Sequence, residues 1–408
     1  MKRQDNFSTS EKIRDFNTNL MISTRKLKFH AMNEDPYRFF RATAHLYFEK
    51  TVASSFLSES PPAWICGDMH LENFGSYKGD RGIAHFNLND FDECLLAPCL
   101  FDVARMITSI HVSSKALQIS SSEAEKLCDL FMNGYFLSLR QGYIRVLERK
   151  TTTGVIRKFL KEVECRQRKE FIKRRVMVVK GKKELICDGK HALPLHEEDK
   201  LVLMASFQKR MDDTPHLQNW TIQDLAFRLA GTSSLGLKRF IVLASEKGKE
   251  ERSYLLDIKE TRPSCVKKYV RLRQPQWESE GSRIVEVQKR VLPDPPPLLC
   301  SVALEDNNFV LKELQPVADR IDYNLFRGKK HKLGEILSDM GCVSAWGVLR
   351  SSGREGAANA DALIRFGERE KEARKALHAF GVSSAVEVLK QFQEYKKSYT
   401  QGFFTYKK

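Results

Sequence analysis

The chain has 408 residues, 42% of them hydrophobic, and its 68 Lys and Arg against 52 Asp and Glu give a net charge of +16. This length and apolar content suit an ordinary soluble protein with a large core, in two domains or lobes. No segment approaches the about 18 apolar residues of a membrane span and the first residues lack the apolar stretch of a signal peptide, so we expect a cytoplasmic protein without a membrane partner.

The nine cysteines and the positive charge indicate little by themselves. The cysteines are scattered without C-x-x-C spacing, which predicts reduced thiols in place of a disulfide framework or a zinc site. Basic residues are densest over 166–183 and 267–273. A solvated helix face and hairpin is the favoured interpretation, attraction of a phosphorylated ligand is the functional alternative, and nucleic-acid binding is unlikely but not excluded by the charge.

Two short motifs near the N-terminal end predict phosphoryl transfer. Residues 67–74 read Gly-Asp-Met-His-Leu-Glu-Asn-Phe, and residues 89–93 read Asn-Asp-Phe-Asp-Glu after a predicted strand. Such transfer needs a carboxylate to orient the attacking hydroxyl, and an amide oxygen with a second carboxylate to hold magnesium. Asp68 suits the first role, and Asn73 and Asp90 suit the metal.

Two neighbouring side chains have less certain roles. His70 is included as a catalytic candidate, although a histidine in such a loop more often braces the backbone through hydrogen bonds than touches substrate. Asp92 either adds to the metal site or caps the turn, and we favour the cap. Upstream, residues 36–51 predict one aromatic amphipathic helix, from which Arg38 or Arg41 could reach a phosphate site.

These motifs resemble the catalytic and metal-binding loops of aminoglycoside phosphotransferases and choline kinases, whose pattern is Gly-Asp-x-His-x-x-Asn, a strand, and Asp-Phe or Asp-Trp. The wider run 66–105, with Phe39-Phe40-Arg41 upstream, is similar to the bacterial family known as domain of unknown function 2252, over most of the chain. The first resemblance implies a protein-kinase-like fold, ATP and Mg²⁺ as cofactors, and a small hydroxylated molecule as acceptor. It also implies that Asp102 accepts backbone hydrogen bonds from the catalytic loop.

A second cluster lies far downstream, in a Gly/Ser/Thr loop between two predicted strands. Its glycines let the backbone approach an anion, and its amides and hydroxyls can donate to phosphate oxygens. A plain β-hairpin turn would use the same residue types. The phosphate-loop candidates are Gly231, Thr232, Ser233, Ser234 and Gly236.

The following strand and helix fit a nucleotide-binding lobe. By the resemblance, Lys259 near the end of the strand 253–260 contacts the nucleotide phosphates, and Glu286 of the next predicted helix holds it in an ion pair. Glu260 is a competing partner, but it neighbours Lys259 on a strand and would point to the opposite face. Two more predicted strands, 299–304 and 309–314, complete the lobe, and by the resemblance the backbone near Glu313 and Leu314 binds the adenine edge.

The order of these parts is unusual, because the catalytic loop precedes the nucleotide lobe in the chain. We therefore expect a two-lobed α+β protein of kinase-like fold that is circularly permuted, which packing allows when termini lie close together on the surface. Residues 1–200 would form the first part of a helical catalytic lobe, 220–320 the nucleotide-binding lobe with an antiparallel sheet, and 321–408 the second part of the helical lobe. The helix predicted from 331 would precede the catalytic loop in space.

The sequence thus predicts an ATP- and magnesium-dependent phosphotransferase that acts on a hydroxyl of an unidentified small molecule. One alternative is a nucleotidyltransferase that holds ATP in reverse and adenylylates a protein; in that case residues 166–183 would supply the extra cations. Another is a nucleotide-binding pseudokinase with a regulatory role, against which the intact set Asp68, Asn73, Asp90 and Lys259 argues. Nothing in the sequence indicates the oligomeric state.

Overall fold

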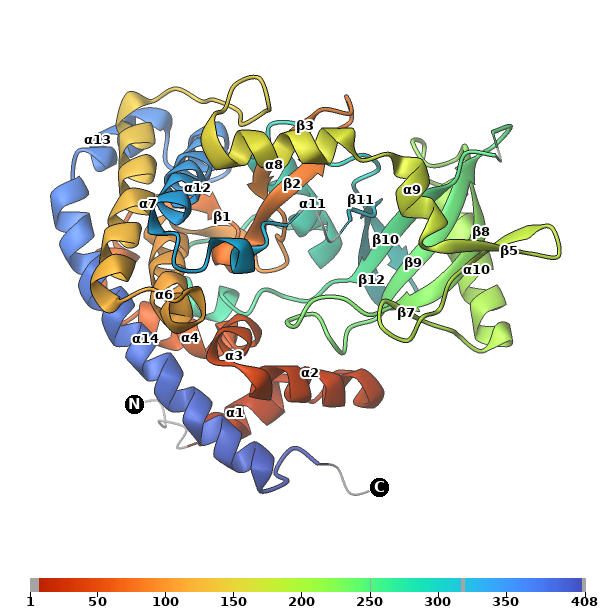
Figure 1. The fold of residues 1–408 in the computed structure, drawn as a ribbon, viewed down its shortest axis with the longest axis horizontal. Helices are drawn as coiled ribbons and strands as arrows, with labels where there is room; N and C mark the ends of the chain where they lie inside the picture. Colours follow the sequence, from red (N-terminus) through yellow and green to blue (C-terminus); the bar gives the residue numbers. More distant parts are fainter. Residues whose placement is uncertain (1–6, 250, 317–319, 406–408) are drawn as a thin grey trace.

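The computed structural model describes residues 7–249, 251–316 and 320–405. It is an α+β protein in which helices from both ends of the chain form one large part and the middle of the chain forms an antiparallel sheet (Figure 1). In Figure 1 the long helices lie at the left and the sheet at the right. No helix within the described ranges is both long and apolar enough to cross a membrane.

The helical part surrounds the larger of the hydrophobic cores. Its helices are α1 (Thr9–Phe16), α2 (Ile22–Glu34), α3 (Pro36–Ala42), α4 (Ala44–Thr51), α5 (Ser55–Ser58), α6 (Leu100–Leu117), α7 (Ser121–Gln141), α8 (Gly154–Cys165), α12 (Lys330–Arg350), α13 (Ala360–Gly367) and α14 (Glu370–Thr400). The single helix expected over 36–51 is broken at Thr43, whose hydroxyl donates to the carbonyl of Phe39 at 2.8 Å. At the C-terminal end, α14 is a single long helix of 31 residues.

Helices α7 and α12 approach so closely that only glycine fits between them. A Cβ added to Gly134 would lie 2.3 Å from the carbonyl oxygen of Ser338, and one added to Gly341 would lie 2.1 Å from that of Phe131. α7 is held at its start by a capping box of Ser120 and Glu123, which satisfies backbone donors that the helix itself leaves free. This pair of helices is the packed centre of the helical part.

The sheet has six antiparallel strands in the order β11-β12-β10-β9-β8-β7. These are β7 (Ala192–Leu193), β8 (Trp220–Arg228), β9 (Arg239–Glu246), β10 (Tyr254–Glu260), β11 (Cys300–Leu304) and β12 (Asn307–Glu313). The five strands after residue 220 are those expected from the sequence. Helix α11 (Glu280–Val291) connects β10 to β11 and packs on β11 and β12.

The two faces of the sheet have different cover. On one face, Phe207 and Met211 of α10 (Glu197–Asp212) pack on strand residues such as Val242 and Leu256. On the other face, α9 (Arg168–Lys173) and the hairpin of β5 (Val176–Val179) and β6 (Lys182–Leu185) cover an apolar half. The rest of that second face, nearer the helical part, is charged.

The motif residues sit on two small ladders at the junction of the helices and the sheet. β1 (Pro62–Ile65) pairs with β4 (Leu95–Pro98), and β2 (Phe74–Lys78) pairs with β3 (Ala84–Leu88), which is the hairpin strand expected before Asp90. The described ranges also contain short 3-10 helices: η1 (Leu71–Asn73), η2 (Lys267–Tyr269) and η4 (Tyr323–Phe326).

The contact of α7 with α12 predicts that Gly341→Ala destabilises the fold. The added methyl group has no room beside the carbonyl of Phe131, so the helices must separate, and we expect the free energy of unfolding to fall by roughly 1 to 3 kcal/mol. Urea denaturation measures this change. Ser122→Ala on the exposed side of α7 is the control and should change it by less than about 0.5 kcal/mol; an equally small effect of Gly341→Ala would contradict the close approach.

Candidate functional site

Helix α6 fixes the loop that carries Asp68. The carboxylate of Asp102 accepts the backbone N–H groups of Cys66 at 2.8 Å and Gly67 at 3.0 Å, which confirms the contact expected for it. Gly67 has φ of +77°, and a Cβ there would lie 2.0 Å from the carbonyl oxygen of Glu93. The loop therefore needs glycine at this position to lie against the Asp90 segment.

Asp68 is held by a buried arginine of the same helix. Arg105 donates from Nε to Asp68 Oδ1 at 2.5 Å, and its guanidinium lies 4.1 Å from the ring of Phe40. None of the described hydrogen bonds uses the second oxygen, Oδ2. Burial raises the pKa of Asp68, and Arg105 opposes that rise. A carboxylate anchored by one oxygen in this way has its other oxygen available for a hydroxyl in the adjacent cavity.

Asn73 joins the two motif loops to each other. Its Nδ2 donates to the carbonyls of Asp68 and Asp90, both at 3.1 Å, and its Oδ1 accepts the N–H groups of Asp90 at 2.8 Å and Asn89 at 3.3 Å. The oxygen expected to bind metal is thus already used by two backbone donors. In this structure Asn73 therefore positions Asp68 relative to Asp90.

His70 braces the loop. Its Nδ1 lies 3.3 Å from the hydroxyl of Tyr37, which in turn accepts the N–H of Glu72 at 3.1 Å. Burial holds the pKa of His70 well below its usual value, so the ring is neutral. His70 is also absent from the residues that line the cavity beside Asp68, so the structure gives it a supporting position.

Lys259 meets both aspartates of the second motif. Its Nζ lies 3.6 Å from Asp90 Oδ1 and forms a closer ion pair with Asp92. Partial burial favours the neutral acid at Asp90, but Lys259 and Lys312 hold the pKa of Asp90 below its usual range. Two carboxylates from one loop and an ammonium from β10 therefore converge, as the sequence predicts for Asp90 and Lys259.

Asp92 does not have the cap role favoured from sequence. The N–H of Asp92 donates to Asp90 Oδ1 at 3.3 Å, so Asp90 caps the turn while the carboxylate of Asp92 pairs with Lys259. Asp90 and Asp92 thus face one cation position, which the lysine ammonium fills.

The carboxylates of Asp90 and Asp92 fit a magnesium ion. At nucleotide sites Mg²⁺ is bound by one or two carboxylates, and water and phosphate oxygens complete its coordination. No cluster of three or more His, Cys, Asp or Glu side chains suited to a metal occurs in the described ranges.

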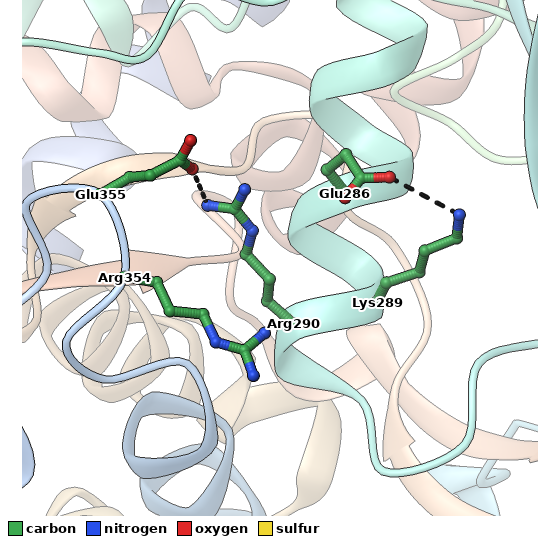
Figure 2. Close-up of a pocket in the computed structure, with 5 residues that line it drawn as sticks. All are labelled: Glu286, Lys289, Arg290, Arg354 and Glu355. Atoms are coloured by element: carbon green, nitrogen blue, oxygen red, sulfur yellow. Dashed lines mark ion pairs between the residues drawn. The ribbon is translucent and has the colours of Figure 1, made fainter.

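The expected ion pair between Lys259 and Glu286 is wrong. Glu286 instead pairs with Lys289 at 3.5 Å, where it lines a shallow pocket of about 430 Å³ with Arg290, Arg354 and Glu355 (Figure 2). The buried side of α11 carries Ile284 and Val287, and Glu286 lies on its half-exposed side. The helix orientation therefore directs this carboxylate away from β10.

Arg283 of the same helix connects α11 to the loop that carries Asp90 and Asp92. Its Nη2 donates to the carbonyl of Asp92 at 2.9 Å and its Nη1 donates to the carbonyl of Cys94. The sequence offered one signal for it: Arg283 stands at helical spacing with Val287 and Val291 in an otherwise apolar stripe. Sequence reasoning missed this link between α11 and the metal loop.

The Gly-rich loop lies where it was expected, between β8 and β9. Gly231 has φ of +72° and Gly236 has φ of +100°, and none of the described hydrogen bonds uses the N–H groups of residues 231–234. Ser233 and Ser234 line the cavity beside Asp68, and Thr232 is not among its lining residues. The loop is therefore close to Asp68, Asp90 and Asp92 and retains backbone donors.

The N-terminal helices close this loop from outside, which the sequence did not predict. Lys28 of α2 donates to the carbonyl of Ser233 at 2.8 Å, and the N–H of Met21 donates to that of Gly236 at 3.0 Å. A Cβ on Gly236 would lie 2.8 Å from Leu20. Burial lowers the pKa of Lys28 to about 7.

The backbone N–H groups expected to bind adenine already donate to carbonyls of the protein. The N–H of Glu313 donates to Pro297 at 3.2 Å and that of Leu314 donates to Leu255 at 2.7 Å. The Leu314 side chain packs in the apolar cluster with Phe171, and the Glu313 carboxylate pairs with Arg168 at 2.6 Å. The basic segment from α9 thus covers this edge, so the adenine contact expected at Glu313 and Leu314 is not supported by the structure.

A cavity of about 240 Å³ unites these groups. Its lining includes carboxylates of the motif loops, serines of the Gly-rich loop, and side chains of the N-terminal helices: Asp68, Asp90, Asp92, Glu93, Ser233, Ser234, Phe16, Leu20 and Lys28. Segments more than 150 residues apart in the chain therefore face one cavity. The cavity is apolar toward Phe16 and Leu20 and anionic toward the aspartates.

The anchoring role of Asp102 can be tested by its removal. Asp102→Ala leaves two buried N–H groups without an acceptor, and we expect the free energy of unfolding to fall by about 2 kcal/mol or more. Asp102→Asn keeps one acceptor oxygen, so its free energy of unfolding should fall less than that of Asp102→Ala. Denaturant titration of both variants compares them; equal, small losses would show that Asp102 does not hold the loop.

No curated protein and no solved structure matches this chain. A family model, described as "Uncharacterized protein conserved in bacteria (DUF2252)", matches residues 23–398. That range includes the motif loops, the Gly-rich loop, Lys259 and α11. The chain belongs to this family of uncharacterized bacterial proteins, DUF2252.

Proposed function

We propose that the protein is an ATP- and magnesium-dependent phosphotransferase that acts on a hydroxyl group of a small molecule. One observation carries this proposal. Asp68, Asp90 and Asp92 line the same cavity as serines of the Gly-rich loop, and the Lys259 ammonium forms ion pairs with Asp90 and Asp92. A group that orients a hydroxyl, carboxylates for magnesium, and a lysine with backbone donors for phosphates are the parts that phosphoryl transfer needs.

Each residue then has a definite task. Asp68, held by Arg105, accepts the hydrogen bond of the acceptor hydroxyl through Oδ2 and orients it. Asp90 and Asp92 would hold magnesium, which neutralises phosphate charge when it is bound. Lys259 would then exchange its aspartate partners for phosphate oxygens, and the N–H groups of residues 231–234 would donate to the same phosphates.

The sheet supports a kinase-like fold as part of this proposal. β8, the Gly-rich loop, β9, the lysine strand β10, α11, β11 and β12 follow one another in the order expected of a nucleotide lobe. The catalytic loops precede them in the chain but lie beside them in space, which is what a circular permutation would produce.

Nucleotidyl transfer is a second candidate, favoured by the covered edge at Glu313 and Leu314. A base cannot use those N–H groups, because they already donate to Pro297 and Leu255. A nucleotide that lies in reverse would place its base toward the apolar side of the cavity near Phe16 and Leu20, and its α-phosphorus near Asp90. A nucleotide-binding protein without turnover is the third possibility.

Transfer of label from ATP distinguishes these functions. The protein is incubated with Mg²⁺ and ATP labelled at either the γ or the α position, together with a panel of hydroxylated metabolites and aminoglycosides. We expect γ-label on a small molecule. Label from the α position on protein would establish nucleotidyl transfer, and nucleotide binding without either transfer would contradict both enzyme functions.

Substitution of the carboxylates tests the site itself. Asp68→Asn should lower the transfer rate by about 10² to 10⁴-fold, because the hydroxyl loses its acceptor. Asp90→Ala should abolish magnesium-dependent transfer. Asp80→Ala, at an exposed turn of the same hairpin, is the matched control and should leave the rate unchanged. Full activity of Asp90→Ala would refute the assignment.

A further inference from the structure

Beyond Lys259, the charged half of the sheet carries three more cations. Arg228 ends β8, Arg239 begins β9 opposite Lys259, and Lys312 lies on β12 opposite Asp257 of β10. Residues at alternate positions of one strand, and their direct partners on neighbouring strands, share a face of the sheet. We call Arg228, Arg239 and Lys312 the sheet cation cluster.

Only one carboxylate of the sheet serves this cluster. Asp257 Oδ1 lies 2.8 Å from Arg228 Nη1, and its Oδ2 lies 2.5 Å from Arg239 Nη2. Burial favours the neutral acid, but the two guanidinium groups hold the pKa of Asp257 below its usual range. The aspartate is ionised and therefore neutralises one of the two arginines, not both.

Lys312 has no carboxylate partner within the part of the chain that the structure describes. Its ammonium makes one long hydrogen bond, 3.5 Å to the carbonyl of Asn89, next to Asp90. Burial lowers the pKa of Lys312, and the nearby carboxylates of Asp257 and Asp90 oppose that shift only in part. An enclosed cation without a partner is costly, and buried charges are normally paired or bind a ligand.

A purely structural role explains part of the cluster. An ion pair of Asp257 with Arg228 and Arg239 joins β8, β9 and β10 and would stabilise the sheet with no ligand. That role leaves Lys312 unexplained, because Lys312 makes no ion pair in this network. It also leaves an excess positive charge beside the metal loop.

The cluster is enclosed but not sealed. The side chains of Arg228 and Arg239 each retain 13% of their accessible surface. The cover from α9 lies on the apolar half of this face, over Leu255 and Ile241. On the charged half, Lys312 reaches the carbonyl of Asn89 in the Asp90 loop. An anion bound there would lie next to Lys259 and Asp90.

We propose that Arg228, Arg239 and Lys312 form a second phosphate-binding subsite, at the sheet side of the same cleft and separate from the Lys259 clamp. Its ligand is a phosphate group, either in the phosphate chain of the nucleotide or on a phosphorylated acceptor. The subsite deepens the proposed function and rests on it for the choice of a phosphate as the anion. Guanidinium pairs and a lysine are the groups that bind phosphate most often.

Calorimetric binding of inorganic pyrophosphate to the full chain, without magnesium, tests the subsite. Lys312→Met keeps most of the side-chain volume and removes the charge, and we expect pyrophosphate to bind about tenfold or more weakly to it. Lys312→Arg should restore most of the affinity. Lys289→Met removes one positive charge from the exposed side of α11 and is the matched control, expected to change the affinity less than twofold.

The same variants identify the source of the phosphate. Parallel loss of ATP affinity in Lys312→Met assigns the subsite to the nucleotide, whereas unchanged ATP affinity with weaker pyrophosphate binding assigns it to a phosphorylated acceptor. Wild-type protein that does not bind pyrophosphate, or Lys312→Met that binds it like Lys289→Met, would overturn the proposal. Asp68→Asn should still bind pyrophosphate, so absence of transfer with retained binding would refute the proposed function alone.

Discussion

The contact of Lys259 with Asp90 and Asp92 is the interaction on which the site depends. It joins the sheet to the helical part through two carboxylates that would repel each other without a cation between them. An ion-pair cluster of this kind is stable only while its three charged side chains are held in place. Asn73 supplies that restraint from the loop that carries Asp68, and Arg283 supplies it from α11.

One turn of α6 serves the other side of the cavity. Asp102 and Arg105 are three residues apart and so lie on the same helix face. Asp102 holds the backbone of the loop at Cys66 and Gly67, and Arg105 holds the Asp68 carboxylate of the same loop. A shift of α6 would therefore move both the loop and its functional group together, which keeps Asp68 in register with Asp90.

Charge is distributed across the cleft in a way that suits a phosphorylated ligand with a metal ion. Aspartates of the motif loops face the cavity on one side, and Lys259, Arg228, Arg239 and Lys312 lie on the sheet. If magnesium replaced the Lys259 ammonium between Asp90 and Asp92, the lysine would be left with no carboxylate, and the positive charge of the cleft would rise. Phosphate groups are the ligands that such a cleft would attract most strongly.

The sequence predicted those parts of the site in which one short segment determines its own geometry. The hairpin before Asp90 and the glycine-dependent loop at 231–236 are of this kind. The Asp102 contact and the approach of Lys259 to Asp90 join distant segments, and they were expected only from the resemblance to phosphotransferases. Glu286 was wrong because helical periodicity does not tell which of two polar positions turns toward a strand. The adenine contact at Glu313 and Leu314 was wrong because α9, more than 140 residues away in the chain, covers this edge of the sheet. The sequence gives no signal of whether a backbone N–H group is free or already bonded.

A double-mutant cycle tests most directly whether Asp90 and Lys259 belong to one nucleotide and metal site. The affinity for a non-hydrolysable ATP analogue with Mg²⁺ would be measured by calorimetry for the wild type, Asp90→Asn, Lys259→Met and the double variant. We expect the two losses to be non-additive by about 0.5 to 3 kcal/mol, as for groups that act on one ligand. Additive losses, or an affinity unchanged by either substitution, would contradict the shared site.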